Sequence, residues 1–170
     1  DPQWPLEYER EMGVVSDVLG QGDIYRISHI GSTAVPGLLA KPTIDILLEI
    51  EQMTDIDKLI RSLCDAGYIH SHQPGKPAPH MMFMKGYTPQ GFEGQVFHLH
   101  VRYPGDWDEL CFRDYLRAHP EVAREYGRLK QRLAPQYRND RDGYTAAKGD
   151  FIKEHTATAR RETGIRYIVK

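Results

Sequence analysis

Cysteine is scarce in this chain, which has only Cys64 and Cys111 among its 170 residues. The two lie far apart, neither belongs to a CxxC pair, and both fall in apolar helical patterns. We therefore expect buried free thiols rather than a disulfide or a metal site. No apolar run reaches the roughly 20 residues that a transmembrane helix needs, and the first residues do not resemble a signal peptide. These absences predict a cytoplasmic protein with no membrane partner.

The chain also lacks an excess of charge of either sign. Its 22 Lys and Arg residues are balanced by 24 Asp and Glu residues, which gives a formal net charge of −2. Nucleic acid is therefore not expected as a partner, although a local basic patch stays open. The length predicts one domain over residues 1–170. The chain starts at Asp1 without an initiator Met, which indicates a trimmed chain or one that begins inside a longer protein.

Hydrophobic periodicity divides the chain into strands and helices. Alternation is clearest at 43–50 and 95–103, where apolar residues occupy one face of each strand. Helical spacing is clearest at 55–66, where Thr54 can cap the start. The other expected elements are helices at 5–19, 106–118, 120–134 and 144–161 and strands at 23–30, 68–69 and 81–85. This order predicts an α/β (α+β) fold with a mixed β-sheet, helices packed on it and a helical C-terminal third.

Neither a GxxxxGK[ST] phosphate loop nor a GxGxxG dinucleotide motif occurs in the sequence. A different small-residue turn, centred on Gly31, Ser32 and Thr33, connects the strand candidates 23–30 and 43–50. Backbone N–H groups and hydroxyls in such a turn can hold a phosphate, and Asp45 on the next strand can hold Mg²⁺. The alternative is a capped turn beside a solvent-facing aspartate.

Two histidines, His98 and His100, share one face of the later strand. Histidines spaced in this way can both reach one ion, hydrogen-bond a phosphate, or act as acid and base near neutral pH. The alternative is a pair of structural histidines on a half-exposed sheet face.

Basic side chains for an anionic ligand are available at Lys41, Arg102, Arg113 and Lys148. Each alone is typical of solvated surface, and the neighbouring Asp114 competes for Arg113. Tyr144 and Lys148 are spaced i, i+4 and should share one helix face. The Arg-rich segment 124–141 alternates with acids, which predicts a solvated helix surface.

The run HIGSTAVPGL at 29–38, followed by Lys41-Pro42 and Ile44-Asp45-Ile46, resembles the GrpB family. The resemblance continues through HLHV at 98–101 and FRDYLR at 112–117, and it ends with Tyr144, Lys148 and Phe151-Ile152. This family resembles the nucleotidyltransferase superfamily of the polymerase-beta type, so the resemblance implies a nucleotidyltransferase-like fold. In some bacteria the same domain is fused behind a dephospho-coenzyme A kinase.

The superfamily pattern places a Gly-Ser turn before two acids spaced i, i+2 on a strand, which can hold a pair of metal ions. Gly31, Ser32 and Asp45 match this pattern, but Leu47 replaces the second acid. Glu49 lies on the same face at a distance of roughly 13 Å, which is too far to share a metal pair with Asp45. The departure argues against standard two-metal nucleotidyl transfer and predicts at most one Mg²⁺ ion, held by Asp45.

The resulting functional hypothesis is a cleft that binds a nucleotide or other phosphorylated small molecule, with a transferase activity left open. The expected catalytic residues are Asp45, His98 and His100. The expected ligand-binding residues are His29, Gly31, Ser32, Thr33, Lys41, Arg102, Arg113, Tyr144 and Lys148. The alternative hypothesis is a catalytically silent regulatory or partner-binding module, for example one linked to coenzyme A biosynthesis through a protein partner or a fused kinase domain.

Overall fold

The computed structural model describes residues 1–72, 75, 79–164 and 167. Its elements follow in the order α1 (Trp4–Leu19), β1 (Ile24–Ile30), the 3₁₀ turn η1 (Ser32–Ala34), β2 (Thr43–Ile50), α2 (Ile56–Asp65), β3 (Ile69–Ser71), β4 (Met81–Thr88), β5 (Gly91–Arg102), α3 (Asp108–Ala118), α4 (Pro120–Gln136), α5 (Arg141–Ala147) and α6 (Gly149–Thr163). The predicted mixture of strands followed by a helical C-terminal third is confirmed. No helix in these ranges is both long and apolar enough to cross a membrane.

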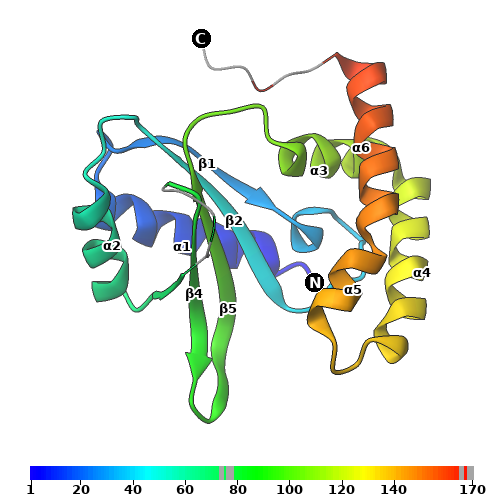
Figure 1. Ribbon diagram of the computed structural model, residues 1–170, viewed down its shortest axis with the longest axis horizontal. Helices are drawn as coiled ribbons and strands as arrows, with labels where there is room; N and C mark the ends of the chain where they lie inside the picture. Colours follow the sequence, from blue (N-terminus) through cyan, green and yellow to red (C-terminus); the bar gives the residue numbers. More distant parts are fainter. Residues whose placement is uncertain (73–74, 76–78, 165–166, 168–170) are drawn as a thin grey trace.

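The five strands form one mixed sheet in the order β1-β2-β5-β4-β3. β2 and β5 are parallel neighbours, and the other adjacent pairs are antiparallel. Figure 1 shows α1 and α2 on one side of the molecule and α3 to α6 grouped on the other, with the β4–β5 hairpin projecting beyond the sheet. The parallel pairing brings residues that are distant in sequence next to each other at the centre of the sheet.

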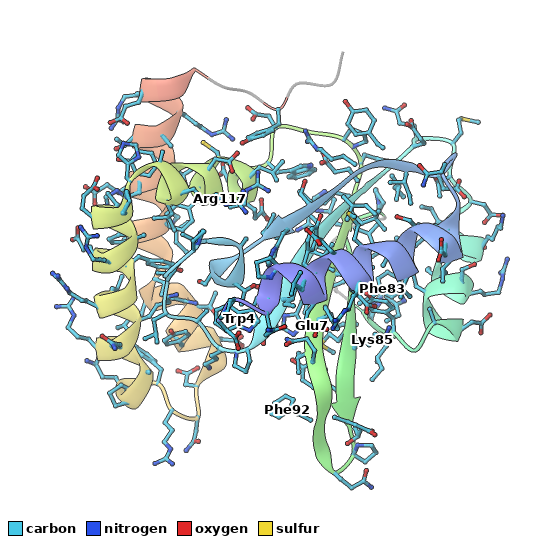
Figure 2. All side chains as sticks on the ribbon, turned by 180° about the vertical axis from the view of Figure 1, so that it is seen from behind. Trp4, Glu7, Phe83, Lys85, Phe92 and Arg117 are labelled. Atoms are coloured by element: carbon cyan, nitrogen blue, oxygen red, sulfur yellow. The ribbon has the colours of Figure 1, made fainter. Side chains whose placement is uncertain are left out.

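The main core lies between one face of the sheet and helices α1 and α2. Ile46 and Leu99 on the central strands are fully buried against Val15 of α1 and Leu63 of α2. Seen from behind, α1 crosses this face, with Phe83 and Lys85 near it (Figure 2). Alternation in the sequence therefore identified the core face of both central strands correctly.

The opposite face of the sheet is partly covered by the C-terminal helices. Leu47 is fully buried with Ile30 and Leu110 of α3. Glu49 is also fully buried, and its carboxylate accepts hydrogen bonds of 2.5 and 2.8 Å from Arg26. The polar face predicted for β2 is therefore open around Asp45 but closed farther along the strand.

Three local expectations were wrong. Asp55, not Thr54, caps α2, since its carboxylate accepts a hydrogen bond from the backbone N–H of Lys58 at 3.0 Å. The helix expected at 144–161 is two helices, α5 and α6, which meet at Lys148. Cys64 is exposed, because it lies outside the buried stripe of α2, whereas Cys111 is a buried free thiol as predicted.

Candidate functional site

Asp45 is held between two histidines at the centre of the sheet. The parallel register pairs Asp45 of β2 with His98 of β5, and His100 follows two residues later on the same face. Oδ1 of Asp45 lies 3.4 Å from Nδ1 of His98 and 3.5 Å from Nε2 of His100. The structure thus brings together the three residues that the sequence nominated as catalytic.

Hydrogen bonding extends this cluster and keeps Asp45 ionised. Burial alone raises the pKa of the Asp45 carboxyl, but hydrogen bonds from His100 and His98 outweigh burial and lower the pKa to about 2. The other ring nitrogen of His98, Nε2, lies 2.7 Å from the hydroxyl of Tyr87, and the two rings stack. No local sequence pattern selects Tyr87, because the β4–β5 pairing places it beside His98.

The glycine turn contacts the carboxylate of Asp45 directly. Gly31 has a φ of +70°, and a Cβ atom added to it would lie 2.5 Å from Oδ2 of Asp45. A side chain at this position is excluded both by the backbone conformation and by the aspartate. The expected neighbourhood of the Gly31-Ser32 turn and Asp45 is therefore present.

Lys130 of α4 is a site residue that the sequence interpretation missed. The alternating charges of 124–141 predicted a solvated surface, but Lys130 is 7% exposed. Its Nζ atom donates a 2.9 Å hydrogen bond to Oγ of Ser32 and a second bond to the carbonyl of Leu39. Nζ also lies 4.7 Å from the centre of the Tyr126 ring. Lys130 therefore ties α4 to the small-residue turn.

Two more lysines converge on Tyr144. Nζ of Lys41 lies 5.2 Å from the centre of the Tyr144 ring, and Nζ of Lys148 lies 4.2 Å from it. Tyr144 and Lys148 therefore meet as expected, although Lys148 occupies the junction of two helices rather than one helix face. Burial and the charge of Lys41 lower the pKa of Lys148, and Asp45 partly offsets them.

A cavity of about 670 Å³ opens beside the turn. Gly31 and Ser32 form one part of its lining, and the apolar part includes Phe112, Tyr126 and Ile152. The volume is typical of small-molecule sites. Asp45, His98 and His100 are not among its lining residues. Of Ser32 and the three residues expected to be catalytic, Ser32 alone lines this cavity.

His29 and Thr33 point away from this site. His29 pairs with Ile46 in the β1–β2 ladder and so belongs to the opposite face of the sheet from Asp45. Its ring stacks on Tyr8, and its Nε2 atom lies 3.0 Å from Oγ1 of Thr33. The antiparallel register therefore separates His29 from the Asp45 cluster, and Thr33 stays with His29 through their contact. Both residues line a different cavity, so their assignment to a ligand stays a prediction.

The two predicted arginines line the cavity but already have protein partners. Arg113 donates hydrogen bonds of 2.7 and 3.0 Å to Asp114 and a third to the carbonyl of His29. The guanidinium of Arg102 lies 5.4 Å from the centre of the Trp107 ring. The competing reading for Arg113, a salt bridge with Asp114, is therefore the one observed.

The donor set does not fit a two-metal centre. Leu47 occupies the position of the second acid and is fully buried, while Glu49 is engaged by Arg26. Within the described ranges, no group of three or more His, Cys, Asp or Glu side chains is placed to hold a metal ion. Asp45 is left as the carboxylate that could accompany a single ion.

The comparisons of sequence and of structure with known proteins agree with one another. The family model described as "GrpB protein" matches residues 1–158. A UPF0157 protein of Pseudomonas aeruginosa is 39% identical over 89% of this chain, which spans 62% of that protein. The crystal structure of the conserved protein GrpB from Enterococcus faecalis superposes with a TM-score of 0.83 at 30% identity, covering 97% of each chain.

A third relative is more than twice as long as the part that matches this chain. A protein of Mycolicibacterium paratuberculosis named dephospho-CoA kinase is 27% identical over 91% of this chain, which spans 43% of its length. The chain therefore corresponds to about two thirds or less of these two curated relatives. The family match itself covers most of the chain and includes the turn and Asp45. This chain belongs to the GrpB protein family, as its motif at 29–38 predicted.

Proposed function

We propose that this chain binds a nucleotide or other phosphorylated small molecule, with a phosphate group beside Ser32 and the three lysines Lys41, Lys130 and Lys148. The observation that carries the proposal is a concentration of positive charge that the carboxylate of Asp45 offsets only in part. Burial and the nearby Lys148 lower the pKa of Lys130 to about 8, and Lys41 in turn contributes to the lowered pKa of Lys148. A bound anion would relieve this mutual repulsion.

The cavity supports a ligand larger than phosphate alone. It begins at Ser32, where the phosphate is proposed to bind, and continues along Phe112, Tyr126 and Ile152. Apolar and aromatic side chains of this kind suit the organic part of a phosphorylated molecule. In this proposal Asp45 holds one Mg²⁺ ion that would neutralise phosphate charge, while His98 and His100 orient the carboxylate. A transferase activity would use His100, whose ring contacts Asp45, as the acid or base.

A thermal-shift series tests the binding proposal. ATP, dephospho-coenzyme A and pyrophosphate would each be added with and without Mg²⁺. At a hundredfold excess over Kd, binding stabilises the fold by about 2.7 kcal/mol. Lys148→Met should reduce the stabilisation, because it removes one of the converging charges. Lys153→Met is the matched control, since Lys153 is exposed on α6. The absence of stabilisation by all three ligands would contradict the proposal.

A second candidate function rests on the relative named dephospho-CoA kinase. Leu47 replaces an expected metal-binding acid, which favours a silent module that acts on a kinase partner. Here the chain would bind a dephospho-coenzyme A kinase and alter its activity. Mixing the two proteins and measuring complex formation by sedimentation, together with the KM of the kinase, separates this function from ligand binding.

A further inference from the structure

Ser32 and Lys130 are hydrogen-bonded to each other at the edge of the cavity. Nζ of Lys130 lies 2.9 Å from Oγ of Ser32, which is a direct hydrogen bond. The second hydrogen bond of Lys130, to the carbonyl of Leu39, holds the amine in place on the side of the turn. Ser32 lines the cavity, whereas Lys130 is buried behind it. A substrate in the cavity would therefore meet the hydroxyl first.

We propose that Ser32 is a nucleophile activated by Lys130 and that the pair cleaves carboxylic esters with a small apolar acyl group. The apolar cavity lining at Phe112 and Ile152 provides the space for that group. A serine hydroxyl is a weak nucleophile unless an adjacent base takes its proton, and serine–lysine pairs are one arrangement that supplies such a base.

The reaction would proceed in two balanced steps. Neutral Nζ of Lys130 takes the proton of Oγ of Ser32 as Oγ bonds to the ester carbonyl carbon. The bond to the alcohol oxygen then breaks, and the alcohol leaves with the proton from Nζ. In the second step Lys130 takes a proton from water as the water oxygen attacks acyl-Ser32. The carboxylic acid is released, and the proton returns to Oγ of Ser32.

The surroundings of Lys130 favour its neutral form. Burial is the main cause that lowers its pKa to about 8, and the positive charge of Lys148 adds to it. Tyr126, which packs on Nζ, stays protonated because burial raises its pKa. The positive charge of Lys41 lowers the pKa of Lys148, and the negative charge of Asp45 raises it. A substantial fraction of Lys130 is therefore neutral near pH 8, and the leucine carbonyl can still accept a hydrogen bond from the neutral amine.

Ester cleavage and phosphate binding require different protonation states of Lys130. Esterase chemistry needs the neutral amine, whereas phosphate binding needs the positive charge. Lys130→Arg tests the requirement for a neutral amine, because arginine keeps the charge and the hydrogen-bond donors but does not lose its proton. The variant should lose the ester reaction, and its urea unfolding curve reports whether it is folded.

The test uses the full chain with a fluorophosphonate probe and with p-nitrophenyl butyrate. Mass spectrometry of peptides should locate the phosphonyl adduct on Ser32, and ester cleavage should release p-nitrophenol. Ser32→Ala should abolish both reactions, and Lys130→Arg should slow them by about 100-fold or more. Ser62→Ala on α2 is the control and should react like the wild type.

A second measurement needs no variant at Lys130. The wild-type labelling rate should rise with pH and level off above a midpoint near 8. Lys148→Met should move that midpoint upward, because a repelling positive charge is removed. The inference is overturned if Ser32 reacts no faster than Ser62, or if Lys130→Arg reacts within threefold of the wild type.

Discussion

Gly31 lies so close to Asp45 that a side chain on the glycine would overlap the carboxylate. A Cβ atom on Gly31 would lie 2.5 Å from Oδ2 of Asp45, and the backbone of Gly31 has a φ of +70°. The two histidines that contact Asp45 join the turn to β5 through the same carboxylate.

Gly31→Ala should destabilise the fold more than Gly37→Ala. Both glycines have positive φ, but a Cβ atom on Gly37 meets nothing within 4 Å. The difference between the two variants isolates the clash with Asp45, for which overpacking predicts about 1–3 kcal/mol. Urea unfolding of both variants provides the measurement. Equal losses would show that the aspartate moves aside without cost.

The stability contributed by Asp45 should depend on pH in the acid range. Its pKa in the fold, about 2, lies below the ordinary value of 3.8, so the contribution is present above about pH 4. It is lost as the pH falls from 4 through 2. The pKa difference corresponds to roughly 2 kcal/mol. The free energy of unfolding of Asp45→Asn should therefore approach that of the wild type as the pH falls, whereas a constant gap would contradict the pairing.

The stability contributed by His29 should depend on pH in a higher range than the stability contributed by Asp45. Burial, followed by the charge of Arg117, lowers its pKa from 6.5 to about 4. Because the folded pKa is the lower one, the stability is present above pH 6.5 and is lost as the pH falls through 4. The pKa difference corresponds to roughly 3 kcal/mol. His29→Gln retains an amide donor for Thr33 and does not titrate, so it should lose less stability than the wild type between pH 7 and 4.5 in urea unfolding.

The ion pair between the half-buried Arg26 and the fully buried Glu49 should contribute to stability as a unit. Glu49 is fully buried and depends on Arg26 and the backbone N–H of Gly105. Arg26→Met should destabilise the fold by about 3 kcal/mol, because it leaves the carboxylate without its counter-charge. Adding Glu49→Leu should restore much of the loss. A double variant as unstable as the single one would show that the carboxylate is tolerated alone.

The core face and the central residues of the site could be predicted from local sequence patterns. Alternation along 43–50 and 95–103 places Asp45, His98 and His100 on faces opposite the aliphatic residues of the main core, and the strand period of two fixes this within each strand. The motif at 29–38 identified the family for a similar reason, since a glycine with positive φ followed by small residues is a local requirement of the turn.

Pairing between distant segments decided the rest. The β1–β2 register turned His29 away from the site, and the β4–β5 hairpin brought Tyr87 onto His98. Lys130 lies in a charge pattern that is equally compatible with a solvated helix, and it is buried only because α4 packs over the turn at Ser32. The sequence by itself therefore determined which face of β2 and of β5 carries the polar residues of the site. Tertiary structure decided which charges meet there, because burial and charge repulsion depend on contacts between segments nearly 100 residues apart.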